Sequence, residues 1–126
     1  MEPELIKALK ALSDITRLRI VNLLQYGDLC VCELETLLDI TQSNASRHLL
    51  KLGNAGMVKY YKHAKYVYYA INGHLMDHYP FLTGLLNMLK DEPAKLPECV
   101  DDLQRLNSYK GQGYTCEDIK QGKVCF

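Results

Sequence analysis

The chain has 126 residues and a mass of 14.4 kDa, which is enough for one compact domain and too little for two ordinary ones. Hydrophobic residues make up 48% of the chain and charged residues 24%, a globular composition that argues against disorder. The 15 basic and 15 acidic side chains give a formal net charge of zero. Taken alone, this balance weighs against a strongly basic nucleic-acid-binding protein.

The first residues and the cysteines indicate a compartment. The chain starts with acidic residues and not with a basic region followed by an apolar stretch, so we expect no secretory signal. Its apolar runs are far shorter than a membrane span, so we expect no membrane partner. The five cysteines are an odd number and cannot all pair within one chain. We therefore expect a cytoplasmic protein whose reduced thiols bind metal or sense redox.

Charge is distributed unevenly along the chain. Residues 1–39 carry seven acidic and four basic side chains, and residues 91–126 carry seven acidic and five basic ones. Residues 40–76 contain no Asp or Glu and five basic side chains. These five are Arg47, Lys51, Lys59, Lys62 and Lys65. A segment without negative side chains can lie against a phosphate backbone without local repulsion.

The spacing of the apolar residues predicts four helices, then a β-hairpin, then a further helix. The first helix is expected at residues 3–12 and the fourth at 42–55. The second carries the apolar face from Ile15 to Leu24 and stops at Gly27, and the third is a short helix that contains Val31 to Leu38. Ser13 or Asp14, Asp28 and Thr41 are suited to cap the second, third and fourth of them. The hairpin strands are expected at residues 57–61 and 66–71, on either side of a basic turn. The last helix is expected to start at residue 75 and to end before Pro93.

This order predicts a mainly α protein with a small β-hairpin wing, which is the order of a winged helix-turn-helix (α-α-α-α-β-β-α). We expect residues 1–90 to form the DNA-binding and dimerisation domain. Residues 91–126 contain few aliphatic side chains and several glycines and prolines. We expect them to form a cysteine-containing C-terminal tail with one short helix near residues 100–106.

The fourth predicted helix has the residue types that read DNA. Gln and Asn can pair with adenine edges, Arg can pair with guanine, and helix N-terminal amides favour phosphate. The residues expected to contact DNA from this helix are Thr41, Gln42, Ser43, Asn44, Ser46, Arg47 and His48. From the wing, Lys62, His63 and Lys65 are expected to contact the backbone. The alternative for each group is an ordinary solvated helix start or turn.

Cys30 and Cys32 form a Cys-x-Cys pair at the expected start of the third helix. On a regular helix, side chains two residues apart diverge by about 200° and cannot share one ion. In the first turn they can, because the backbone is freer there and the helix dipole stabilises a thiolate. The alternative is that both are small buried apolar residues.

Four segments in chain order resemble motifs of the ArsR/SmtB family of winged-helix metalloregulators. ALSDITRLR at 11–19 is similar to the family's helix junction, and DLCVCEL at 28–34 is similar to its metal box. SNASRHL at 43–49 is similar to its recognition helix, and VYY at 67–69 matches its outgoing wing strand. The resemblance covers residues 5–90.

The resemblance implies a homodimer joined through its first and last helices, which represses its own operon by binding double-stranded operator DNA. The DNA is released when the sensed ion binds. Boxes of this type point to As(III) or Sb(III) as the inducer, bound by three thiolates in a pyramid, with Cys30 and Cys32 as ligands. No organic cofactor and no enzymatic activity are implied.

The sequence departs from the best-known arsenic box at Glu35, where that box has its third cysteine. Carboxylate is a poor substitute for thiolate toward a soft ion. The third sulfur is then expected from the tail of either protomer, with Cys116 and Cys125 favoured over Cys99 because glycines surround them. Binding by two sulfurs alone is the other possibility.

Three other functions stay open at this point. The first is a repressor of the same fold that senses cadmium, lead or zinc, and the second is a thiol-redox switch. The third is a thiol enzyme of arsenic detoxification, which is disfavoured because no His or Lys adjoins Cys30 or Cys32 to activate it. His74 and His78 lie four residues apart where some family members sense zinc, although polar helix-start residues are the default explanation.

Overall fold

The computed structural model describes residues 2–91 and 96–125. Within these ranges, the helices are α1 (Glu4–Ala11), α2 (Ile15–Leu24), α3 (Val31–Leu38), α4 (Gln42–Asn54), α5 (Gly73–His78), α6 (Pro80–Asp91), α7 (Pro97–Gly111) and α8 (Cys116–Lys120). The strands are β1 (Leu29–Cys30), β2 (Val58–His63) and β3 (Tyr66–Ile71). This is the predicted winged helix-turn-helix, with the strand β1 and the helix α8 as elements that the sequence pattern did not predict.

The starts of α2 and α4 follow from their capping residues. The backbone N–H of Arg17 donates to the carboxylate of Asp14 at 3.0 Å, and the N–H of Asn44 donates to the Thr41 hydroxyl at 3.2 Å. These bonds satisfy amides that have no partner inside the helix. Asp39 has a φ of 53°, in the left-handed region, and this reverses the chain between α3 and α4. The caps predicted for α2 and α4 are confirmed, whereas α3 is capped by Cys30 and not by Asp28, because the strand β1 lies between Asp28 and the helix.

The antiparallel sheet has the strand order β1-β3-β2. β2 and β3 form the wing, and their register pairs Val58 with Ile71 at one end and His63 with Tyr66 at the other. β1 pairs Cys30 with Tyr68, so the segment that leads into α3 is fixed to the wing. A strand of two residues is too short to show a period of two, and for this reason the sequence pattern did not reveal it.

The helix that was expected from residue 75 is divided into α5 and α6. Tyr79 has φ −129° and ψ 79°, outside the helical region, and Pro80 begins the next helix. Proline has no N–H to donate and disfavours helical geometry in the residue before it, so the division falls here. Leu75, Leu82 and Leu86 still face the core, so the apolar periodicity was correct although the helix is not continuous.

The tail is more ordered than the expected short helix near 100–106. Helix α7 covers 15 residues, and its Leu106 and Tyr109 are buried in the same apolar core as Ile20 and Leu34. The aliphatic residues of α7 are sparse and gave a weak helical signal, and a polar contact anchors the helix in addition to its apolar packing. Asp102 is fully buried and accepts two hydrogen bonds of 2.8 Å from the guanidinium of Arg19.

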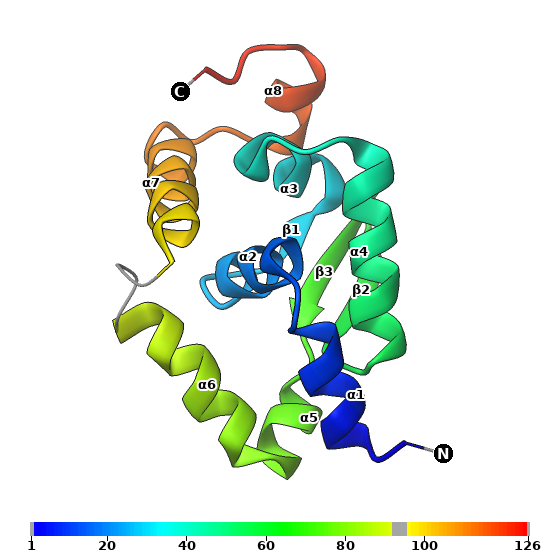
Figure 1. Ribbon diagram of the computed structural model, residues 1–126. Coiled ribbons are helices and arrows are strands. Elements are labelled where there is room, and N and C mark those ends of the chain that lie inside the picture. Colours follow the sequence, from blue (N-terminus) through cyan, green and yellow to red (C-terminus); the bar gives the residue numbers. More distant parts are fainter. Residues whose placement is uncertain (1, 92–95, 126) are drawn as a thin grey trace.

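The elements place the tail and the wing on either side of the helix-turn-helix. Figure 1 shows α6 and α7 along one side of the molecule and α4 with β2 on the other, with α2 and α3 between them. Helix α8 lies at the end of the molecule where α3 begins, and it contacts α3. Among the described residues, no helix has both the length and the apolar character needed to cross a membrane.

The turn at the tip of the wing places Ala64 in a left-handed backbone conformation, which a substitution can test. Ala64 has a φ of 55°, in a region that costs a residue with a Cβ roughly 1–2 kcal/mol. Glycine avoids this cost, but it loses more backbone freedom on folding, which lowers stability by roughly 0.5–1 kcal/mol. We predict that Ala64→Gly raises the free energy of unfolding by up to about 1 kcal/mol, measured by urea denaturation.

Gly56→Ala is the matched control, because Gly56 has a φ of 78° with open space around it. This substitution is expected to lower the free energy of unfolding through backbone strain alone. A destabilised Ala64→Gly variant would contradict the left-handed turn at the wing tip.

Candidate thiol site and nucleic-acid interface

Three cysteine sulfurs meet at the start of α3. The Sγ atoms of Cys30, Cys32 and Cys116 all lie within 4.8 Å of one another, and those of Cys30 and Cys32 are 2.9 Å apart. Cys30 and Cys116 are buried, and Cys32 is partly exposed. Three thiols gathered in this way form a site suited to a soft ion that prefers sulfur ligands.

The Cys-x-Cys pair can converge because the two residues belong to different backbone conformations. Cys30 has φ −87° and ψ 168°, which is extended, and it precedes the first residue of α3. Cys32 is the second residue of that helix. The divergence of about 200° expected on a continuous helix therefore does not apply. Cys116 reaches the pair from the opposite direction, as the first residue of α8.

The three thiols have different acidities. A hydrogen bond from the Cys30 thiol to the Cys32 sulfur raises the pKa of Cys30 and lowers the pKa of Cys32 to about 7. Burial raises the pKa of the Cys116 thiol to about 12. Cys32, the partly exposed member, is therefore the thiol of the cluster that loses its proton most readily.

Glu33 links the thiol cluster to α7. Its carboxylate accepts a hydrogen bond from the backbone N–H of Cys30 at 3.0 Å and another from the Tyr109 hydroxyl at 2.5 Å. Both side chains are buried, and burial raises the pKa of the Tyr109 hydroxyl, which keeps it a donor. The tail helix therefore helps to hold the backbone of Cys30 in place.

The other cysteines and Glu35 lie outside the cluster. Cys99 is buried on α7, where desolvation raises its pKa to about 11, and Cys125 is exposed near the end of the chain. Among the described residues, the geometry brings only Cys116 of the three tail candidates to the Cys-x-Cys pair. Glu35 lines the mouth of the site, where partial burial raises its pKa.

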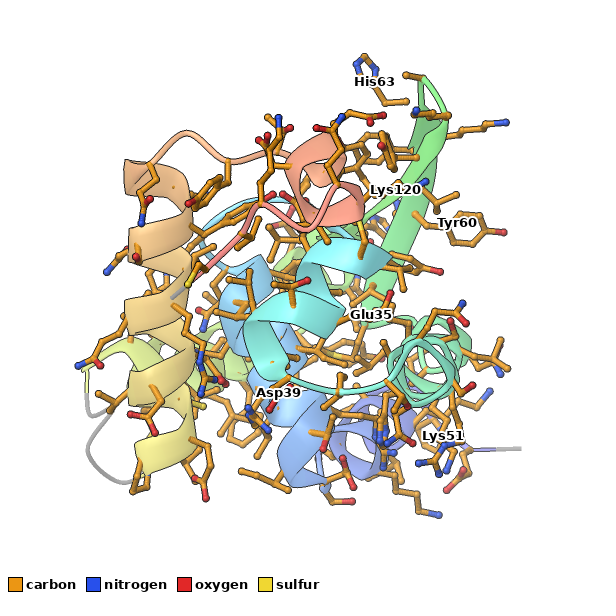
Figure 2. The ribbon with its side chains drawn as sticks, turned by 90° about the horizontal axis from the view of Figure 1, so that it is seen from above. Glu35, Asp39, Lys51, Tyr60, His63 and Lys120 are labelled. Carbon is orange, nitrogen blue, oxygen red and sulfur yellow. The ribbon has the colours of Figure 1, made fainter. Side chains whose placement is uncertain are left out.

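A hollow of about 270 Å³ opens onto Cys30 and Cys32. Its lining includes Glu35 of α3, Gln42 of α4, Lys65 of the wing turn and Lys120 of α8. Figure 2 shows Lys120 directed toward the wing strands and Glu35 on α3 in the direction of α4. Small solutes can thus reach the thiols at a point where the recognition helix, wing and tail converge.

Helix α8 also contacts the wing through the residue that follows Cys116. Glu117 forms an ion pair with Lys65 and accepts a hydrogen bond of 2.7 Å from the Tyr66 hydroxyl. The ammonium group of Lys120 lies 4.8 Å from the centre of the Tyr66 ring. One turn of α8 therefore carries both a thiol of the cluster and the carboxylate that binds the wing tip.

Of the α4 residues that were expected to contact DNA, all but His48 are exposed or partly exposed. Thr41, Gln42, Ser43, Asn44 and Arg47 are exposed and Ser46 is partly exposed. Within this set, Arg47 donates to Asn44 at 2.9 Å and Gln42 donates to Ser46 at 3.2 Å. The wing residues Lys62, His63 and Lys65 are exposed as well. In Figure 2, Lys51, Tyr60 and His63 lie along one side of the molecule, which is the side of α4 and the wing.

His48 is the exception, because only 7% of its surface is exposed. Its Nδ1 atom lies 3.3 Å from the guanidinium of Arg17 and 3.8 Å from the carboxylate of Asp14. Burial lowers the pKa of His48, so the ring is neutral at physiological pH. The expectation that His48 faces DNA is corrected: it fastens α4 to the start of α2, and we leave it out of the proposed contact set.

Sequence reasoning missed the contacts Glu33–Tyr109 and Glu117–Lys65. Each joins residues more than fifty positions apart, and no motif or period connects them. His74 and His78 do lie together, with ring centres 5.7 Å apart, but the described residues place no third metal ligand with them.

The fold and the three-thiol cluster together define a winged helix-turn-helix protein with a candidate metal site, and comparisons with known proteins find regulators with similar sequences. The family model for bacterial regulatory proteins of the arsR family matches residues 14–60. The arsenical resistance operon repressor of Escherichia coli K12 is 45% identical over 71 residues, 56% of this chain and 61% of that protein. A cadmium resistance transcriptional regulatory protein CadC homolog of Staphylococcus aureus is 43% identical over 67 residues, 52% of this chain and 55% of that protein.

Solved structures agree with the sequence comparisons. The homodimeric winged helix-turn-helix DNA-binding domain of a possible ArsR-family transcriptional regulator from Mycobacterium bovis superposes with a TM-score of 0.60. It is 28% identical, and the match covers 71% of this chain and 80% of that one. Residues 14–60 therefore form a domain of the arsR family of bacterial regulatory proteins. The chain spans less than two thirds of the length of the two curated relatives above.

The link between Glu33 and Tyr109 yields a stability prediction. Tyr109→Phe removes the hydroxyl but keeps the ring, and it leaves one buried carboxylate oxygen of Glu33 without its donor. We predict that the free energy of unfolding falls by about 1–3 kcal/mol in chemical denaturation. Tyr114→Phe, on a partly buried ring beside Tyr109, is the matched control and should change it by less. Equal effects of the two substitutions would contradict a structural role for this bond.

Proposed function

We propose that the protein is a transcriptional repressor that binds operator DNA as a homodimer and releases it when As(III) or Sb(III) binds Cys30, Cys32 and Cys116. The observation that carries the proposal is the convergence of these three sulfurs within 4.8 Å at the start of α3. Trivalent arsenic prefers three thiolates in a pyramid, and the cluster supplies three sulfurs from one chain. Thiols of this kind stay reduced in the cytoplasm, where the repressor would act.

The binding reaction is an exchange of ligands without change of oxidation state. Arsenite, As(OH)₃, gives up three hydroxyl groups and forms three As–S bonds. Each hydroxyl group leaves as water and needs one proton. The thiols of Cys30 and Cys116 supply two of these protons, and solvent supplies the third because Cys32 reacts as a thiolate. The lowered pKa of the partly exposed Cys32 makes its sulfur the first to bind.

DNA binding is assigned to the exposed face of α4 and to the wing. The N-terminal residues of α4 would enter the major groove, where the amide and guanidinium groups of Gln42, Asn44 and Arg47 can pair with base edges. Lys62, His63 and Lys65 would contact the neighbouring backbone. Their exposure and the absence of acidic residues from 40–76 support this assignment.

Dimerisation is assigned to α1 and to the α5–α6 segment, which replaces the single last helix expected from the sequence. Large apolar side chains are exposed on both elements: Ile6 is 40%, Phe81 64% and Met88 56% exposed. Burying such side chains against a second copy would remove apolar surface from water. The homodimeric relative from Mycobacterium bovis supports this arrangement.

The release of DNA would follow from the position of the cluster between two DNA-contacting elements. Cys30 pairs with β3 of the wing, and Cys32 lies in α3, which packs against α4. Drawing the three sulfurs around one ion changes the first turn of α3 and the position of α8 together. The two recognition helices of the dimer would then no longer match half-sites about 34 Å apart or a multiple of it.

The third thiol is the sharpest test of this proposal. We predict that Cys116→Ser raises the arsenite concentration for half-release of operator DNA by more than about tenfold, because even an outer-shell partner of a metal ligand is worth roughly 10–100-fold in affinity. Fluorescence anisotropy of labelled operator DNA measures the release. Cys99→Ser and Cys125→Ser are the matched controls and should respond as the natural chain does.

Three outcomes of such titrations would overturn the proposal. Release by arsenite that is equal in the natural chain and Cys116→Ser would remove Cys116 from the site. Release by cadmium, lead or zinc but not by arsenite or antimonite would assign the cluster to another ion, and the CadC relative makes cadmium the first of these to include. Release by peroxide alone would assign it to thiol oxidation.

The contact between α8 and the wing predicts how Glu117 contributes to the response. Glu117→Gln removes the charge that binds Lys65 while leaving the thiols in place. We predict that the variant binds arsenite with unchanged stoichiometry, but that the ratio of DNA affinities without and with arsenite falls, by less than tenfold for an exposed ion pair. Asp101→Asn, an exposed acidic residue of α7, is the control. An unchanged ratio in Glu117→Gln would contradict coupling through the wing.

A further inference from the structure

A basic surface lies between α1 and the C-terminal half of α4, outside the residues assigned to DNA above. An open hollow of about 460 Å³ separates the two helices, and Lys7, Lys10, Arg17 and Lys51 line it. Glu2 is the one carboxylate among the described lining residues, and it forms an ion pair with Lys10. Four positive charges therefore face one hollow, with one negative charge among them.

Two of the four basic side chains are available for a ligand. Arg17 is engaged, because its Nε donates to the carbonyl oxygen of Ala11 at 2.5 Å and its guanidinium approaches His48. Lys7 and Lys51 are exposed and, in the part of the chain that the structure describes, have no carboxylate partner. Ammonium groups that remain unpaired on one surface favour a polyanion.

The length of α4 fixes where Lys51 lies when the helix is in DNA. With 13 residues the helix is about 20 Å long, whereas the major groove is about 12 Å wide. If the N-terminal residues reach the bases and the helix axis crosses the groove, the last turn of α4 lies close to the phosphates at the rim. Lys51 lies near this end, and Figure 1 shows α1 beside it.

We infer that Lys7 and Lys51 form a second phosphate-binding surface, which contacts the operator backbone between the two half-sites. The inference rests on the proposed repressor function. Because α1 is also assigned to the dimer interface, the surfaces of the two protomers would adjoin across the dimer axis. The central stretch of the operator would then be held by backbone contacts that carry no sequence information.

Salt dependence tests the inference directly, because each phosphate contact contributes about 0.9 to the slope of log affinity against log salt concentration. We expect Lys7→Gln and Lys51→Gln each to lower the magnitude of this slope by about 0.9 for each phosphate that the dimer no longer neutralises. Lys7→Arg should retain it. Lys123→Gln removes an exposed lysine of the tail and should leave the slope unchanged. Thermal melting of each variant confirms that it folds.

A second measurement locates the contact on the DNA. Replacing the phosphates between the half-sites with neutral methylphosphonates should weaken binding of the natural chain, and should weaken binding of Lys7→Gln less. An unchanged slope in Lys7→Gln and Lys51→Gln, with the natural chain binding its operator, would overturn the inference and leave the repressor function intact. Failure of the natural chain to bind any operator would overturn both.

Discussion

Cys30 holds the last position of β1 and the residue position just before α3, so one residue joins the sheet of the wing to the helix-turn-helix. Its backbone pairs with Tyr68 of β3, and its N–H donates to Glu33 in the first turn of α3. A force applied at its sulfur therefore acts on the wing and on the helix that supports α4. The position of the thiol cluster depends on this connection, and so does the effect on DNA binding that we propose for it.

The tail helices α7 and α8 also contact the start of α3. Tyr109 of α7 binds the carboxylate that caps α3, and α8 adds the thiol of Cys116 next to the carboxylate of Glu117. The buried pair of Arg19 and Asp102 fixes α7 to α2. A buried ion pair contributes little net stability compared with apolar packing, but it strongly disfavours arrangements in which either charge is left alone. It therefore specifies where the tail lies more than how stable the protein is.

The sequence predicted the helix-turn-helix and wing well because these elements are determined by local signals. Capping residues such as Asp14 and Thr41, and the change of apolar period near Gly56, act over a few positions. The tail could not be predicted in the same way, because α7 is placed by Asp102, Tyr109 and other residues whose partners are distant in the chain. His48 shows the same limit: its motif indicates DNA, but its partners Arg17 and Asp14 turn it inward.

Arsenic K-edge X-ray absorption spectroscopy of the arsenite complex tests the central claim most directly, because it counts the sulfur atoms bound to arsenic. We predict three sulfur neighbours in the natural chain and in Cys125→Ser, and two sulfur neighbours with one oxygen in Cys116→Ser. Three sulfur neighbours in Cys116→Ser, or two in the natural chain, would contradict a site formed by Cys30, Cys32 and Cys116.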